Sequence, residues 1–159
     1  MTPPILTPEI QQFVREQRLG FVATVGADGR PNLSPKGTTT VWDDEHLMFA
    51  DIASPQTVEN LAANPHVEIN VVDPIVRKGW RFRGAGTVHR DGSEMERGLA
   101  ILAAAGSTTP RERIASIVVV TVHEAEPLLS PAYDAGLTED RLARRWLSHF
   151  RELHAGHAP

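Results

Sequence analysis

The stretch SPQTVENLAANPHVEINVV, residues 54–72, contains both kinds of secondary structure that we expect in this chain. Ser54 is a favoured N-cap residue, Pro55 suits the first position of a helix, and apolar residues follow at helical spacing. Asn64-Pro65 interrupts this pattern, and residues 67–72 then alternate between apolar and polar side chains. The stretch therefore predicts a helix that ends before Asn64, followed by a half-buried β-strand.

Strand and turn patterns continue on both sides of this stretch. We expect strands at residues 19–25, 32–40, 47–50, 67–72, 80–88 and 114–122, and helices at residues 8–18, 94–105 and about 137–152. Gly84 and Gly86 interrupt one strand, which predicts a bulge or bend of the kind that barrels use at corners. Because no interdomain linker is visible, we predict a single domain over residues 1–159, mainly β with flanking helices, built as a small antiparallel barrel.

Composition narrows the possible functions. The 159 residues carry a formal net charge of −4 and contain no cysteine. The negative charge argues against nucleic acid and anionic lipid as partners, and the missing thiols exclude disulfides and thiol nucleophiles. Any redox chemistry must then come from a bound cofactor. Neither a leader after Met1 nor a membrane-spanning apolar run is visible, so we expect a cytoplasmic protein. His154 and His157 have a spacing compatible with a metal, but no third ligand has suitable local spacing, so no metal site is predicted.

Two segments of the chain predict an anion site. The first turn of the helix that begins after Ser54, with Gln56 and Thr57, offers unpaired N–H groups and a partial positive charge. Lys36, on a preceding strand, supplies a full positive charge. Together they predict a phosphate site, although, taken singly, Ser54 is also explained as a helix cap and Lys36 as a solvated strand residue.

The order of these segments resembles that of the pyridoxamine 5'-phosphate oxidase-like FMN-binding split-barrel family, across residues 8–126. The segments that carry the resemblance are residues 29–37, 47–50, 54–65 and 81–84. The resemblance implies an antiparallel, Greek-key-like split β-barrel that forms a homodimer with FMN at the dimer interface. The related deazaflavin F420 is the alternative cofactor, and some relatives bind heme.

The resemblance also implies which residues surround the flavin. Gln56 and Thr57 stand where the family places a basic or hydroxyl pair for the phosphate, and Thr38–Thr40 stand where main-chain groups and hydroxyls line the ring. Arg81 and Arg83 would reach flavin or substrate across the dimer. The threonine run is also explained by β-propensity, and the two arginines by an exposed basic strand face. The predicted cofactor-binding set is Ser34, Lys36, Gly37, Thr38, Thr39, Thr40, Ser54, Gln56, Thr57, Asn60, Trp80, Arg81 and Arg83.

The predicted function is that of an FMN-dependent oxidoreductase acting on a small molecule, with a nicotinamide nucleotide as a candidate donor. No catalytic side chain is assigned, because the flavin carries the chemistry. The resemblance implies an Arg-Lys pair at Gln56-Thr57 for a true pyridoxamine phosphate oxidase, so a different substrate is predicted. The alternatives are a flavin-binding carrier, electron-transfer protein or sensor without turnover, and an F420-dependent reductase.

Overall fold

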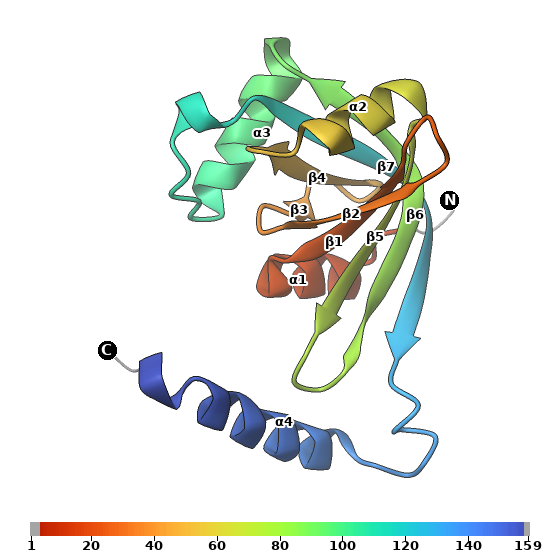
Figure 1. Ribbon diagram of the computed structural model, residues 1–159, viewed down its shortest axis with the longest axis vertical. Coiled ribbons are helices and arrows are strands. Elements are labelled where there is room, and N and C mark those ends of the chain that lie inside the picture. The colour runs from red at the N-terminus through yellow and green to blue at the C-terminus, as the bar shows by residue number, and fades with distance from the viewer. Residues whose placement is uncertain (1–3, 158–159) are drawn as a thin grey trace.

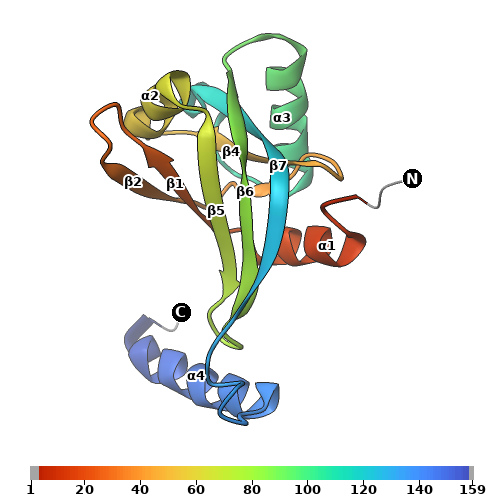
Figure 2. The same cartoon turned by 90° about the vertical axis from the view of Figure 1, so that its right-hand side faces the viewer.

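The computed structural model describes residues 4–157 and contains one seven-stranded antiparallel sheet of order β2-β1-β5-β6-β7-β4-β3. The strands are β1 Gly20–Val25, β2 Pro31–Lys36, β3 Thr40–Val41, β4 His46–Asp51, β5 His66–Asp73, β6 Lys78–His89 and β7 Ser116–Leu129. Figures 1 and 2 show that the sheet curls into a half-barrel. The predicted mainly β, antiparallel split-barrel class is confirmed.

Four α-helices flank the sheet within the described residues. They are α1 Pro8–Gln17, α2 Pro55–Ala63, α3 Gly92–Ala104 and α4 Glu139–Leu153. Figure 1 shows α2 and α3 at one end of the curled sheet and α4 beyond the opposite end. In this part of the chain, every helix is too short or too polar to cross a bilayer.

Two apolar clusters hold α1 and α3 against the sheet. Ile10 and Val14 of α1 are buried among strand residues that include Val22 and Val71. Met95 of α3 belongs to the second cluster, which covers β4 and the start of β7. Burial of each such side chain contributes about 1.5–3 kcal/mol. The C-terminal ends of both helices are thereby fixed near the turn that follows β2.

The long strand β6 contains the predicted bulge. Its pairing with β7 shifts register between Arg83 and Gly84, which confirms the expectation for this glycine-containing strand. A Cβ atom on Gly84 would lie far inside van der Waals contact with the backbone carbonyl of Thr121. Glycine at this position therefore allows the two strands to approach closely where the sheet bends.

The predicted strand over residues 32–40 is wrong in its second half. β2 ends at Lys36, and Thr40 opens the separate strand β3, which pairs with β4. Thr39 explains the break, because its backbone N–H and its Oγ1 both donate to the Lys36 carbonyl oxygen, at 3.2 and 2.9 Å. The side chain of Thr39 also occupies the space that a Cβ atom on Gly20 would need. Local hydrogen bonding thus replaces the extended conformation that the threonine run predicts.

The C-terminal part of the chain also differs from the prediction. β7 runs to Leu129 instead of ending near residue 122, because it stays paired with β6 as far as Lys78. Helix α4 begins after Thr138, whose Oγ1 accepts a hydrogen bond from the N–H of Arg141 at 3.4 Å. Of the helix, only Leu142 is buried. Figures 1 and 2 show α4 beyond the end of the half-barrel, where Arg77 lies over the Trp146 ring and Lys78 pairs with Glu139.

Candidate functional site

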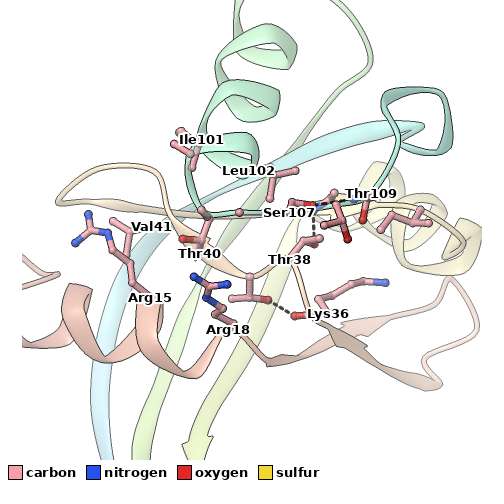
Figure 3. Close-up of a pocket in the computed structure, with 18 of the residues that line it drawn as sticks. Arg15, Arg18, Lys36, Thr38, Thr40, Val41, Ile101, Leu102, Ser107 and Thr109 are labelled. Carbon is pink, nitrogen blue, oxygen red and sulfur yellow. Dashed lines mark hydrogen bonds between the residues drawn. The ribbon is translucent and has the colours of Figure 1, made fainter. Parts of the chain in front are cut away.

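A pocket of about 1050 Å³ opens where the ends of several elements meet. Residues 34–42, which include the end of β2 and the turn to β3, form one wall, and the end of β4 forms another. The C-terminal half of α3 and the loop that follows it contribute Ile101, Leu102 and residues 104–109. Arg15 and Arg18 complete the lining from the end of α1 (Figure 3).

Lys36 is a buried cation in this pocket. The residue is 7% exposed, and its Nζ donates a hydrogen bond to the Ser34 hydroxyl at 2.8 Å and lies 5.9 Å from the centroid of the Phe49 ring. Burial lowers the pKa of the Lys36 ammonium below its ordinary value of 10.5, an effect that the negative charge of Asp51 opposes. Within residues 4–157, Lys36 makes no ion pair. A buried ammonium with a neutral hydrogen-bond partner is suited to binding an anion.

All charged residues that line the pocket are positive. Arg15, Arg18 and Lys36 contribute three cations, and none of the lining residues is an aspartate or glutamate. The whole chain, by contrast, carries a net charge of −4. This local excess of positive charge favours an anionic ligand.

The three threonines beside Lys36 belong to the same wall but differ in their contacts. The Thr38 hydroxyl oxygen accepts a hydrogen bond from the N–H of Ala50 at 2.9 Å, and Thr39 is buried beneath the turn. Thr40 is buried and pairs with Met48 of β4. The threonines therefore fix the turn that carries Lys36 and connect it to β4.

The carboxylate of Asp51, the last residue of β4, lies next to the start of α2. Asp51 Oδ1 accepts hydrogen bonds from the N–H and the hydroxyl of Ser54, at 3.0 and 2.8 Å. Ser54 stands at the N-cap position of α2, as predicted, but its hydroxyl donates to Asp51 and makes no cap hydrogen bond to the helix. Asp51 already provides negative charge at this helix end, which reduces the attraction of the helix N-terminus for a further anion.

The model of the pyridoxamine 5'-phosphate oxidase family matches residues 6–128, which include every strand except the last residue of β7. The chain belongs to that family. HupZ of Group A Streptococcus is 27% identical, with a TM-score of 0.69 over 78% of this chain and 94% of that one. An FMN-binding protein from Syntrophomonas wolfei (15% identity, TM-score 0.61, 77% and 88% coverage) and an F420 reductase (23%, 0.61, 76% and 98%) share the fold. No curated protein matches the chain.

In this family member, the other predicted residues of α2 lie outside the pocket. Asn60 donates to Thr24 Oγ1 at 3.0 Å and accepts from Gln56 Nε2 at 2.8 Å, whereas Thr57 Oγ1 accepts from Asn32 Nδ2 at 3.2 Å. Thr24, Thr57 and Asn60 are all buried. The polar side chains of α2 are thus used to attach the helix to β1 and β2.

We expect Asn60→Ala to lower the free energy of unfolding by about 1–3 kcal/mol, because it leaves buried polar groups without a partner. Glu59→Ala is the matched control, since Glu59 is an exposed residue of the same helix, and its effect should stay below about 0.5 kcal/mol. Urea unfolding of the flavin-free protein measures both values. Equal effects from the two substitutions would show that the buried network does not stabilise α2.

Trp80, Arg81 and Arg83 of β6 also lie away from the pocket of their own chain. Arg83 donates to Glu68 and Glu124 at 3.0 Å each, and these hydrogen bonds raise the pKa of its guanidinium above the ordinary value for arginine. Arg81 forms an ion pair with Glu68 at 3.0 Å, and Trp80 packs beside the main core cluster. A contact between these residues and a flavin across a dimer stays a prediction.

Sequence reasoning missed the contributions of α1 and α3 to the pocket. Arg15 and Arg18 belong to a helix whose pattern indicates only packing, and Ser107–Thr109 occupy a loop without a recognisable motif. No sequence pattern marks Arg18, because the left-handed conformation with which it ends α1, φ 56°, is visible only in the structure.

Proposed function

We propose that the protein is a cytoplasmic FMN-dependent oxidoreductase and that the pocket binds the flavin through its phosphate. The proposal rests on Lys36, a buried ammonium in a cation-rich pocket that donates to the Ser34 hydroxyl and forms no ion pair within residues 4–157. The volume of about 1050 Å³ lies at the upper end of the range of small-molecule sites. Membership of the pyridoxamine 5'-phosphate oxidase family supports a flavin as the ligand.

The residues of the pocket divide into polar and apolar groups. Lys36 and Ser34 would hold the phosphate, and the main chain and hydroxyls of residues 37–40 would contact the ring system. Ile101 and Leu102 provide an apolar wall that excludes water on the α3 side. When bound, the flavin supplies hydride exchange with a small molecule, and the protein binds and orients the two partners.

An oxidoreductase of this kind should accept electrons from a donor, and reduction of the bound flavin by a nicotinamide nucleotide tests this. Anaerobic NADH and NADPH should each be mixed with the flavin-loaded protein while the flavin absorbance is recorded. Bleaching with either donor supports the oxidoreductase. An unchanged spectrum with both would favour the alternative, a flavin-binding carrier or sensor that does not use these donors. The same pocket chemistry suits F420, so its binding is compared with that of FMN.

We further propose that the working form is a homodimer. Leu33 and Phe21 expose 65% and 39% of their surfaces on neighbouring strands, and Leu147 and Leu153 of α4 expose 40% and 59%. Large apolar side chains at such exposure favour contact with another protein surface. Sedimentation of the flavin-loaded protein should give the mass of two chains, and the mass of one chain would contradict the dimer.

FMN binding is expected to weaken as the pH rises through the lowered pKa of Lys36. Above about pH 7 the FMN phosphate is a dianion and binds the charged form of Lys36. At a pH where Lys36 of the flavin-free protein has lost its proton, FMN binding must also take up a proton, which weakens the binding. The affinity should therefore begin to fall at a pH below the ordinary lysine pKa of 10.5. Flavin-fluorescence titrations at a series of pH values measure this. In Lys36→Met the Lys36-dependent fall should disappear, and an identical pH profile would contradict the assignment.

A further inference from the structure

The pocket contains more positive charge than one phosphate needs. Figure 3 shows Arg15 and Arg18 on one side of the pocket and Lys36, with its Nζ pointing away from them, on the other. The two arginines come from the end of α1, whereas Lys36 ends β2. If Lys36 holds the FMN phosphate, the arginine side of the pocket still lacks an anion.

The two arginines are not neutralised by the protein. Within residues 4–157 neither forms an ion pair, and the only side-chain hydrogen bond of Arg15 goes to the neutral amide oxygen of Gln11, at 3.1 Å. The arginines of β6 show the contrasting arrangement, since Arg81 and Arg83 are paired with glutamates. Both arginines are exposed, so their guanidinium groups are solvated in the free protein, and apart from the Arg15 bond to Gln11 their donors are available to a planar carboxylate or a phosphate.

The backbone of Arg18 explains how its side chain reaches the pocket. Arg18 ends α1 in the left-handed region, with a φ of 56°, and its N–H donates to the Val14 carbonyl oxygen at 3.2 Å. Helices commonly end in this conformation. Arg77 has a similar φ of 57° in the turn between β5 and β6, which does not line the pocket. The conformation therefore reflects the end of α1, and the pocket lining is what assigns Arg18 to the site.

We propose that Arg15 and Arg18 form a second anion subsite, which binds a carboxylate or phosphate of the small molecule that reacts at the flavin. This inference rests on the proposed function, because it assumes that Lys36 is occupied by the FMN phosphate. It assigns the substrate to the class of anionic small molecules. Ile101 and Leu102, which line the pocket above the charged side chains in Figure 3, would contact the uncharged part of that molecule.

Inorganic pyrophosphate is a probe for this subsite, because it carries the required charge and no other feature. FMN loading is first measured by absorbance, and pyrophosphate binding to the loaded protein is then followed by ³¹P NMR. The variant is Arg15→Gln with Arg18→Gly, in which glycine suits the positive φ and so preserves the end of α1. Arg90→Gln is the control, because Arg90 is exposed and does not line the pocket.

We expect saturable pyrophosphate binding to the wild type and to Arg90→Gln, and at least tenfold weaker binding to the double variant, with FMN affinity changed less than twofold. Equal pyrophosphate binding by the double variant and the wild type would overturn the inference. A tenfold loss of FMN affinity in the double variant would also overturn it, since Arg15 and Arg18 would then bind the cofactor and not the substrate. Failure of the wild type to load FMN is a separate result, which would refute the proposed function at the first step.

Discussion

Lys36→Met is expected to weaken FMN binding by about 10- to 100-fold. A charge-assisted hydrogen bond contributes about 1.5–3 kcal/mol, and each 1.4 kcal/mol changes an affinity about tenfold. The substitution removes the cation that is 7% exposed in the pocket but keeps most of its apolar volume. Fluorescence titration of the flavin-free protein with FMN measures the effect.

Two comparisons make this result specific to the phosphate. Riboflavin lacks the phosphate, so its affinity should be nearly equal in the wild type and in Lys36→Met. Thr57→Val should leave FMN affinity within about twofold, because Thr57 is buried outside the pocket and is held by Asn32. Equal losses of FMN and riboflavin affinity would show that Lys36 does not bind the phosphate.

We expect Lys36→Met to fold normally, so that a loss of FMN affinity would report on the phosphate contact and not on misfolding. The lowered pKa of Lys36 means that burial of its charged form costs the folded protein stability at neutral pH, and that this cost is relieved as the pH rises through that pKa. Replacing the ammonium with an apolar side chain removes this cost. The Lys36→Met protein without flavin should therefore be at least as stable as the wild type, as urea unfolding would show.

Gly84→Ala is expected to destabilise the protein by more than about 3 kcal/mol, or to prevent its recovery in soluble form. The added Cβ would collide with the Thr121 carbonyl at the bulge between β6 and β7, and backbone cannot move away as a flexible side chain can. Gly37→Ala is the matched control, because a Cβ at Gly37 meets no atom within 4 Å. Thermal unfolding of both variants without flavin checks the prediction. Similar melting temperatures for the two variants would refute it.

Periodicity and helix signals were sufficient to predict most elements of the fold. The helix after Ser54 and the alternating strand that follows Pro65 are observed within one or two residues of their predicted bounds. The bulge at Gly84 was also predictable, because a glycine inside a strand pattern often marks a bulge or a close approach of two backbones. The run Thr38–Thr40 misled the prediction, since its hydrogen bonds to Lys36 and Ala50 depend on tertiary contacts that β-propensity ignores.

The candidate site was predictable only in part. Lys36 and residues 37–40 are neighbours in sequence and share one wall of the pocket. Thr57 and Asn60 were expected beside the phosphate, but the curl of the sheet places them against β1 and β2. The arginines of α1 are brought to the pocket only when the helix packs inside the half-barrel, an arrangement that no local pattern encodes.

The most direct test of the central claim is the absorption spectrum of the purified protein, with mass analysis of the released chromophore and titration of the flavin-free protein with FMN and F420. We predict a flavin spectrum, the mass of FMN, and saturable binding of one FMN per chain. Release of F420, together with preference for it in the titration, would contradict FMN as the cofactor. A colourless protein that binds neither molecule would contradict the flavin site itself.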